Sequence, residues 1–491
     1  MDKFITCFLP FSEADSVAST ICSLRESGVA GRVYMIVPPG QHESIPGADA
    51  EFLQSAGFVT TDALRKMAAV TDSDYVLTYS KGFPLDPGKF ALRRMMQICD
   101  DTGAGMVYSD YFEKKQGILS PHPLIDYQEG SLRDDFNFGS VILYNAKVFR
   151  DACSRMDENY SYAGLYDLRL KISQTHPIIH IQEMLYTEVE TDTRMTGEKQ
   201  FDYVDPRNRA VQIEMERACN NHLRSVNAWL EPHFREMKFD DKSFDCDASV
   251  IIPVRNRVKT IGDAIRSVLN QQTKYSFNLI IVDNYSTDGT TDVIRSFTSD
   301  SRVVHIIPER RDLGIGGCWN EAIFSDLCGR FAIQLDSDDL YIDDSVITRV
   351  IDAFYEQQCA MVVGSYKMVN FDLNEIPPGL IDHREWTPEN GRNNALRING
   401  LGAPRAFYTP VLRDIRIPNV SYGEDYAVGL AISRHYQIGR IYEPLYLCRR
   451  WDENSDALLD VSKANIHNLY KDRIRTIELL ARKRLLNSSD K

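Results

Sequence analysis

Two segments decide the fold: SYAGLYDLRLKISQTHPIIHIQEMLY (161–186) and SYGEDYAVGLAISRHYQIGRIYEPLY (421–446). They align without a gap, and 11 of their 26 positions are identical. Chance would give about one or two identities over this length, so the match indicates an internal repeat. Tyr162 aligns with Tyr422 and Tyr166 with Tyr426. The chain therefore contains two copies of one structural unit.

The likeness continues upstream of both segments at nearly the same spacing. FITCFLPFSEADSVASTICSL (4–24) corresponds to ASVIIPVRNRVKTIGDAIRSVL (248–269), an apolar strand, a proline and a helix. Two further strands correspond: RVYMIVPPG (32–40) to FNLIIVDNY (277–285), and DYVLTYSKGFPLDPGKF (74–90) to FAIQLDSDDLYIDDSVI (331–347). Apolar strands that alternate with helical segments predict an α/β fold with a parallel, doubly wound sheet in each copy.

The repeat also predicts the domain organisation. A chain of 491 residues is too long for one hydrophobic core, so two domains or more are expected. We expect the domains at 1–190 and 246–455, joined by a polar linker at 191–245. In the linker a helix is predicted from Pro206 to Leu230, because proline suits the first helical turn.

Composition limits the classes of function. Hydrophobic residues at 43% and charged residues at 26% are ordinary for a globular chain, while a net charge of −14 argues against nucleic-acid binding. No apolar run is long enough to span a bilayer, and the N-terminal MDKFITCFLPFSEADS predicts a strand rather than a signal peptide. The ten cysteines are scattered, without a C-x-x-C pair, as in a reduced compartment. We therefore expect a cytoplasmic protein, free or peripheral at the inner face of the membrane.

The two copies differ most in their acidic residues. Three acidic positions of the second copy face other residues in the first: Asp283 against Pro38, Asp336–Asp339 against Tyr79–Gly82, and Glu424–Asp425 against Gly164–Leu165. Ligands of open α/β sheets bind outside the carboxyl ends of strands, where these acids are expected. They predict a site in the second domain that the first domain has lost.

The acids suit the chemistry of a metal and a nucleotide. IQLDSDDL (333–340) places three carboxylates directly after a buried strand, either as ligands of Mg²⁺ or Mn²⁺ or as a solvated acidic turn. Asp283 ends a strand, where an acid accepts hydrogen bonds from a ribose or base, or else caps a helix. Glu424–Asp425 opens a predicted helix, where a carboxylate acts as a general base or only favours the helix dipole.

The motifs that hold these acids also resemble those of a known family. VIIPVRN (250–256), IIVDNYSTDGT (280–290), CWNEAI (318–323), LDSDDL (335–340) and YGEDY (422–426), in this order and spacing, resemble the inverting glycosyltransferases of family 2. The resemblance covers roughly 248–455, and a degenerate echo covers 4–190. It implies two tandem domains of the GT-A fold, and because the first lacks the acids, that domain is expected to be a non-catalytic pseudo-domain.

The resemblance implies a role for each motif. Asp338 would hold Mn²⁺ or Mg²⁺, which neutralises the diphosphate leaving group, and Asp425 would deprotonate the acceptor hydroxyl with Glu424 beside it. Asp283 would hold the nucleobase, usually uracil. The residues expected to contact the nucleotide sugar are Pro253, Val254, Arg255, Asn256, Asp283, Asn320, Asp336 and Arg450.

The sequence departs from the family pattern at three places. Arg255 stands where an aromatic residue is typical, and Trp319 where an arginine is common. Trp451, in CRRWDENS (448–455), stands near the position of a histidine metal ligand. Arg449, Arg450 or Asp452 is then expected to meet the diphosphate or the metal.

The C-terminal segment 456–491 predicts an amphipathic helix. Its apolar residues are Leu458, Leu459, Ile466, Leu469, Ile474, Ile477, Leu480 and Leu485, and its basic residues Lys471, Arg473, Arg475, Arg482, Lys483 and Arg484. Such a helix packs on its own domain or on a second subunit, or lies on an anionic membrane surface that carries a lipid-linked acceptor.

The sequence thus predicts an enzyme that moves a sugar from a nucleotide-diphosphate donor, with UDP-sugar the expected class, to a hydroxyl of a glycan or glycolipid acceptor. Three alternatives differ in what they require. A dual-site polysaccharide polymerase needs acids in the first domain, and a sugar- or nucleotide-binding protein needs no general base. A nucleotidyltransferase generally has a basic, glycine-rich N-terminal loop.

Overall fold

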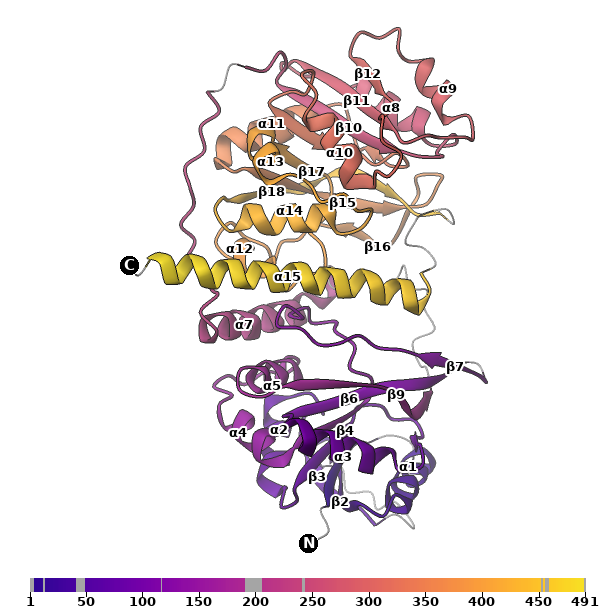
Figure 1. The fold of residues 1–491 in the computed structure, drawn as a ribbon, viewed down its shortest axis with the longest axis vertical. Helices are drawn as coiled ribbons and strands as arrows, with labels where there is room; N and C mark the ends of the chain where they lie inside the picture. The colour runs from indigo at the N-terminus through magenta and orange to yellow at the C-terminus, as the bar shows by residue number, and fades with distance from the viewer. Residues whose placement is uncertain are drawn as a thin grey trace.

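The first half of the chain is built on one β-sheet, coloured indigo to magenta in Figure 1. Its strands are β1 (Ile5–Pro10), β2 (Ala30–Val37), β3 (Glu51–Gln54), β4 (Tyr75–Tyr79), β5 (Asp86–Pro87), β6 (Met106–Lys115), β7 (Ile118–His122), β8 (Val141–Asn145) and β9 (Ile178–Val189). Its helices are α1 (Ala14–Glu26), α2 (Thr61–Val70), α3 (Ala91–Thr102), α4 (Ala146–Ser154) and α5 (Gly164–Ser173). These elements form the first domain.

The second domain follows the same plan. Its strands are β10 (Ala248–Val254), β11 (Phe277–Asp283), β12 (Val303–Ile306), β13 (Phe331–Gln334), β14 (Leu340–Tyr341), β15 (Met361–Val369), β16 (Glu375–Ile381), β17 (Arg405–Tyr408) and β18 (Ile438–Arg449). Its helices are α8 (Ile261–Leu269), α9 (Thr290–Arg295), α10 (Ile315–Ile323), α11 (Val346–Gln357), α12 (Gly391–Asn394), α13 (Thr409–Ile415) and α14 (Glu424–Ser433).

The computed structural model describes residues 4–11, 14–40, 49–115, 117–189, 205–240, 243–451, 454 and 459–489. Two residues singled out in the sequence, Asp452 and Leu458, and the linker segments 190–204 and 241–242 lie outside the described residues. Within the described part of the linker, a 3-10 turn at Pro206–Asn208 leads into α7 (Arg209–Ser225), so the helix ends earlier than the predicted Leu230.

The two sheets have the same topology. The strand order is β3-β2-β1-β4-β8-β6-β9-β5 in the first and β12-β11-β10-β13-β17-β15-β18-β14 in the second, with β7 beside β6 and β16 beside β15. The tandem α/β fold predicted from the repeat is confirmed. Helices cover the central strands on both faces, which is why β10 and β11 are apolar and buried along most of their length.

The prediction of a wholly parallel sheet is wrong. Strands β12, β11, β10 and β13 run parallel, but β17 runs antiparallel to both of its neighbours, β13 and β15. Alternating apolar segments show where strands occur, whereas strand direction depends on the path of the long connections between them. The reversal brings the start of β17, at Arg405, to the edge of the sheet where the parallel strand β13 ends.

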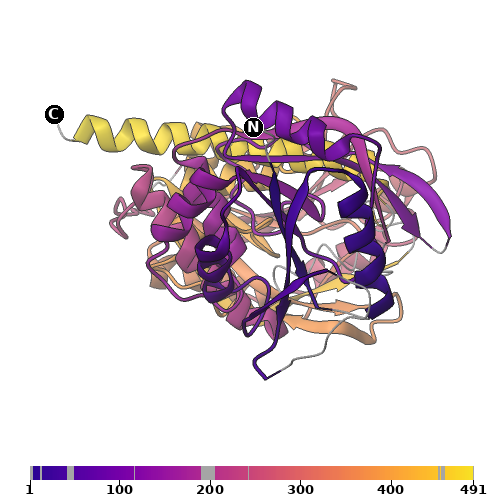
Figure 2. The ribbon, with the colours of Figure 1, turned by 90° about the horizontal axis from the view of Figure 1, so that it is seen from below.

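The last helix, α15 (Val461–Ser489), lies between the two domains (Figure 1). Seen from below, it runs along one side of the molecule (Figure 2). Towards the second domain, the fully buried Arg475 donates to the Tyr426 hydroxyl at 2.8 Å and to the Ile398 carbonyl at 2.9 Å. The expectation that this helix packs on its own chain is confirmed.

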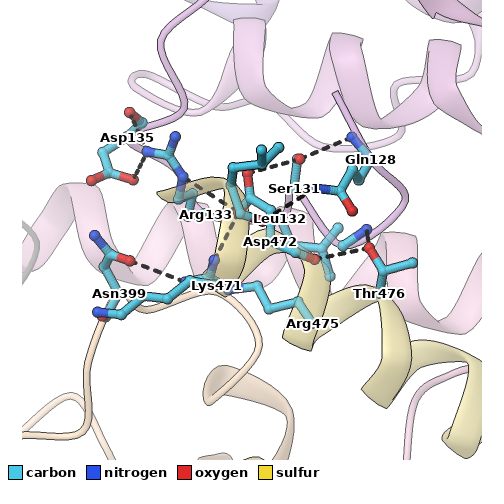
Figure 3. Close-up of polar contacts among 12 residues, drawn as sticks. Gln128, Ser131, Leu132, Arg133, Asp135, Asn399, Lys471, Asp472, Arg475 and Thr476 are labelled. Atoms are coloured by element: carbon cyan, nitrogen blue, oxygen red, sulfur yellow. Dashed lines mark hydrogen bonds and ion pairs between the residues drawn. The ribbon is translucent and has the colours of Figure 1, made fainter. Parts of the chain in front are cut away.

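A loop of the first domain holds the other side of α15 (Figure 3). Ser131 Oγ donates to Asp472 at 2.9 Å, and the Gly130 N–H donates to Thr476 Oγ1 at 3.0 Å. A Cβ on Gly130 would lie 2.1 Å from the Thr476 backbone nitrogen, so only glycine fits this contact without a shift. One hydrophobic cluster also runs from the second domain through α7 into α5. The two domains and α15 thus share one continuous interface.

The outer face of α15 remains exposed. Ile466, Leu469, Ile477 and Leu480 are 65%, 42%, 56% and 55% exposed. Among the described residues, no helix combines the length and the apolar character needed to cross a bilayer.

Candidate active site

The second domain contains a cavity of about 670 Å³ at the edge of its sheet. Residues from β17, α14, β18, α15 and the loop after β13 line it. The cavity brings together the acidic run Asp336–Asp339 with Glu424 and Asp425, two groups that stand more than 80 residues apart in the sequence. The structure therefore gathers two of the three predicted acidic sites in one space.

The acidic run forms a turn held from several sides. The Gln334 side chain donates to Asp336 Oδ1 at 2.9 Å, and the Asp336 N–H donates to the Tyr446 hydroxyl at 2.9 Å. Asp339 Oδ1 accepts from the Arg449 N–H at 2.8 Å. Burial raises the pKa of Asp336, and burial together with Asp338 and Asp336 raises the pKa of Asp339 well above its usual range. The turn concentrates negative charge that a bound cation would stabilise.

Asp338 stands where the C-terminal end of the domain meets this turn. Its Oδ2 accepts from Trp451 Nε1 at 3.3 Å and from Asn454 Nδ2 at 3.3 Å, and Arg257 Nε lies 3.7 Å away. Trp451 therefore reaches the predicted metal position, as its place in the sequence indicated. Across the described residues, no three His, Cys, Asp or Glu side chains converge to enclose a metal ion. An open site of one or two carboxylates is the kind that Mg²⁺ and Mn²⁺ complete with water and phosphate oxygens.

Glu424 and Asp425 form the first turn of α14. Burial and the neighbouring Asp425 raise the pKa of Glu424 to about 8, and Glu424 Oε2 is buried without a hydrogen-bond partner among the described residues. Asp425 is ion-paired with Arg405 at the start of β17. The two neighbouring acids thus differ in environment, one paired with a cation and one not.

The loop that leads into α14 packs tightly on α10. A Cβ on Gly316 would lie 1.9 Å from the Pro418 carbonyl oxygen, and the Gly316 N–H donates to the Val420 carbonyl at 3.0 Å. Asn320 donates to the Ile417 carbonyl at 2.7 Å and accepts from the Ile417 N–H at 3.1 Å. The glycine-rich segment DLGIGG (312–317) and Asn320 therefore position the loop that precedes the two acids.

Only part of the predicted nucleotide-sugar set lines the cavity. The residues that line it are Pro253, Asp336 and Arg450. Within the described part of the chain, the predicted residues that do not line it are Val254, Arg255, Asn256, Asp283 and Asn320. Asp283 is 1% exposed, and its two oxygens accept from the Ser286 N–H at 3.0 Å and from Thr291 Oγ1 at 2.5 Å. Asn256 Oδ1 accepts from the Thr287 N–H at 2.8 Å. In this structure both residues hold the turn after β11.

Among the cavity residues that the sequence analysis did not identify are two arginines. Arg405 and Arg257 line the cavity beside the acids, Arg405 next to Asp425 and Arg257 next to Asp338. Arg257 follows VIIPVRN by one residue, so its nearness to a motif was a usable signal. Arg405 lies in a segment with no recognisable motif, and only the antiparallel course of β17 brings it here.

The matching edge of the sheet in the first domain is much less hollow. The void at this edge, beside Pro10 and Lys81, has a volume of about 10 Å³. Lys81 forms an ion pair with the buried Glu188, which also accepts from Ser140 Oγ. An internal ion pair thus occupies the position that the acidic turn has in the second domain.

Strand pairing corrects the alignment of the two copies by one residue. Ile5 pairs with Tyr75 and Ala248 with Phe331, each five residues before the proline of its strand. The residues in equivalent places are therefore Val37 for Asp283, Ser80 for Asp336 and Gly82 for Asp338, not Pro38, Tyr79 and Lys81. Aligning the sequences by their apolar runs had missed this shift, but none of the corrected counterparts is acidic.

Comparison with known proteins identifies the family. Residues 249–412 match the profile of glycosyl transferase family 2. The chain is 31% identical over 185 residues to TuaG of Bacillus subtilis (strain 168), named for teichuronic acid biosynthesis, which covers 38% of this chain and 71% of TuaG. It is 23% identical over 237 residues to the poly(ribitol-phosphate) beta-glucosyltransferase of Bacillus spizizenii, covering 47% of this chain and 36% of that protein.

Among solved structures, S. aureus TarS 1–349 in complex with UDP-GlcNAc is similar, with 21% identity, coverage of 48% of this chain and 72% of that chain, and a TM-score of 0.38. The sequence match to TuaG extends over most of that relative and exceeds 30% identity. This chain belongs to glycosyltransferase family 2. The resemblance seen in its five motifs is confirmed.

Proposed function

We propose that the second domain transfers a sugar from a nucleotide-diphosphate donor, a UDP-sugar in the first instance, to a hydroxyl of a glycan or glycolipid acceptor. The observation that carries this proposal is the single cavity lined both by Asp336–Asp339 and by Glu424–Asp425. One space then holds the groups for the diphosphate and the group for the acceptor proton. The names of the relatives, which refer to teichuronic acid and poly(ribitol-phosphate), support a polysaccharide acceptor.

In the proposed reaction, the acceptor oxygen attacks the anomeric carbon from the side opposite the leaving group. A carbon–oxygen bond to the acceptor forms, the bond to the diphosphate breaks, and the acceptor proton passes to Asp425. Arg405 positions the Asp425 carboxylate through their ion pair. Attack from the opposite side inverts the configuration at the anomeric carbon.

Asp338 is the proposed metal ligand, with Mn²⁺ or Mg²⁺ as the ion. Burial, and next to it the charge of Asp338, raises the pKa of both Asp336 and Asp339, so a bound cation would favour their ionised forms. Such an ion, when bound, would neutralise the diphosphate as it leaves. Arg450, which lines the same cavity, is proposed to meet the diphosphate. Asp283 is proposed to stand beside the nucleobase.

The first domain is proposed to be non-catalytic and to act as a scaffold. The Lys81–Glu188 ion pair and the small void beside it argue against a second donor site, and so against the dual-site polymerase. Its loop at Gly130–Ser131 instead holds α15. Contact of α15 with a membrane surface, or with a second copy of the chain, stays a prediction supported by the exposed stripe Ile466, Leu469, Ile477 and Leu480.

A donor screen tests the proposal. The full chain is incubated with each nucleotide sugar and Mn²⁺, and the nucleoside diphosphate released by slow hydrolysis is measured. We expect one donor to be hydrolysed well above the others, and Asp338→Asn to abolish this hydrolysis. If no nucleotide sugar is bound or hydrolysed, the proposal is wrong and a non-catalytic role for the protein is favoured.

A further inference from the structure

One wall of the active-site cavity comes from α15, outside the segment that matches the family profile. Lys463, His467 and Lys471 all line the cavity. They stand four residues apart, so they lie on one face of the helix. In a chain with a net charge of −14, this face is a local concentration of basic groups.

The wall has a defined geometry. The ring of Tyr422 stacks on that of His467 with centroids 3.8 Å apart and planes inclined by 12°. Lys471 Nζ lies 4.4 Å from the centre of the same tyrosine ring and donates to the Asn399 carbonyl at 2.5 Å. His467 Nδ1 is buried and has no hydrogen-bond partner among the described residues. His467 therefore brings a nitrogen without a hydrogen-bond partner among the described residues to this wall.

The wall stands beside the acids of α14 rather than the acidic turn. Tyr422 precedes Glu424 by two residues, and Gly423, between them, packs on α15. A Cβ on Gly423 would lie 3.5 Å from Lys471 Cγ. A group bound at this wall would therefore lie near the proposed general base, where the acceptor is expected.

The first domain provides an internal comparison. Its helix α7 packs on α5 as α15 packs on α14. The Gln174 side chain hydrogen-bonds His222 of α7 at 3.2 Å, and Arg434, the matching residue of the repeat, donates to Glu478 of α15 at 3.2 Å. With His222 opposite Glu478, the residues Met215, Val211 and Arg207 stand where the second copy has Lys471, His467 and Lys463. Two of the three positions of the basic wall are thus apolar in the first copy, and the third, Arg207, is ion-paired with Asp205.

We propose that Lys463, His467 and Lys471 form an acceptor subsite for an anionic group, either a phosphate or a carboxylate carried by the acceptor near its reactive hydroxyl. The inference rests on the proposed function and names the acceptor class of the same site. Ammonium and imidazole groups form charge-assisted hydrogen bonds with such anions, and the Tyr422–His467 stack offers an apolar surface to the adjoining sugar or polyol. Lys463, exposed near the start of α15, is the member least involved in internal contacts.

Ligand-observed NMR on the full chain, saturated with UDP and Mn²⁺, tests this subsite. Glycerol 3-phosphate is compared with glycerol, and glucuronate with glucose, which separates phosphate from carboxylate recognition. We expect at least one anion to bind about tenfold more tightly than its neutral counterpart, the size of one charge-assisted hydrogen bond. The double variant Lys463→Gln/His467→Asn should remove this preference. Arg473→Gln, an exposed cation on α15 outside the cavity lining, is the matched control and should keep it.

Calorimetry with UDP keeps the two proposals distinguishable. Normal UDP binding with no preference for either anion overturns the subsite and leaves the proposed function intact. An equal loss of anion binding in Arg473→Gln also overturns it, because the effect would then be non-specific electrostatics. Absence of binding of UDP and of every other nucleoside diphosphate overturns the proposed function itself.

Discussion

Asp425 of α14 is ion-paired with Arg405 of β17, and the Arg405 guanidinium also lowers the pKa of Asp336, which burial raises. One cation therefore links the proposed general base to the acid expected to contact the nucleotide. The pair forms because β17 runs antiparallel and begins where the parallel strand β13 ends. The sheet thus places the Arg405 cation beside both the proposed donor group and the proposed acceptor group.

The first prediction concerns this base. Asp425→Asn should leave donor affinity nearly intact, because the nucleotide and metal are assigned to other residues. Transfer should fall by about two to four orders of magnitude, the usual contribution of a positioned general base. Donor affinity by calorimetry and transfer rate by product formation measure the two effects separately.

Glu424→Gln is the matched control for that variant. It should lower the transfer rate less than Asp425→Asn does. The glutamine amide can still hydrogen-bond an acceptor, and only the proton that Glu424 carries at neutral pH is lost. A normal transfer rate in Asp425→Asn would remove Asp425 from the mechanism. Lost donor binding would instead place it in the nucleotide site.

The second prediction concerns the metal. Asp338→Asn should remove most activity and weaken the dependence on Mn²⁺, because the variant replaces the carboxylate at the proposed ligand position. Activity is measured across a Mn²⁺ titration and in excess chelator. The control is Asp343→Asn, a nearby acid outside the cavity lining. Full turnover of the unmodified chain in chelator would show that Asp338 has another role.

Local motifs explain which site residues the sequence could predict. Asp338, Glu424 and Asp425 each follow a strand or open a helix within a short, recognisable run, so their place at the sheet edge could be inferred. Arg405 could not, because its position depends on the direction of β17, which apolar periodicity does not encode.

The C-terminal helix shows the same limit. Its periodicity predicted a helix, but Arg475 and Arg482, two of the basic residues of the predicted amphipathic helix, are fully buried. Arg475 pairs with Asp472 at 2.8 Å and Arg482 with Glu478 at 2.8 Å, three and four residues earlier on the same helix. Burial of a charge depends on such partners and on carbonyl groups from distant segments, which spacing alone does not reveal.

The third prediction is stoichiometric. Calorimetry with UDP and Mn²⁺ should give one binding site per chain, because the Lys81–Glu188 ion pair occupies the corresponding place in the first domain. Lys81→Met should leave both the stoichiometry and the affinity unchanged. A value near two would revive the dual-site polymerase.

The fourth prediction tests the scaffold role of the first domain. Gly130→Val should displace α15, because even a Cβ would lie 2.1 Å from the Thr476 backbone nitrogen. Overpacking of this kind costs about 1–3 kcal/mol of unfolding free energy. We expect lower stability and a loss of transfer that exceeds any loss of UDP affinity.

Gly57→Ala is the control for that change, since an added Cβ there meets only the Thr60 methyl group at 3.4 Å. It should alter neither stability nor transfer appreciably. If Gly130→Val keeps full transfer, the first domain does not position the α15 wall of the cavity.

The last prediction follows from the raised pKa of Glu424. Because its pKa in the folded state, about 8, lies above the usual glutamate pKa of 4.5, the folded state binds this proton more tightly than the unfolded state. The resulting stability is complete below pH 4.5 and is lost as pH rises through 8. Glu424→Gln has no such proton, so its unfolding free energy should not show this loss. From pH 6 to pH 9 it should rise relative to that of the unmodified chain by at least about 1.4 kcal/mol, the equivalent of one pKa unit. Urea unfolding at both pH values measures the difference, and the exposed Glu356→Gln controls for the loss of a charge.

Parallel pH curves for Glu424→Gln and the unmodified chain would mean that Glu424 is ionised at neutral pH and able to act as a base, which would reopen the choice between it and Asp425.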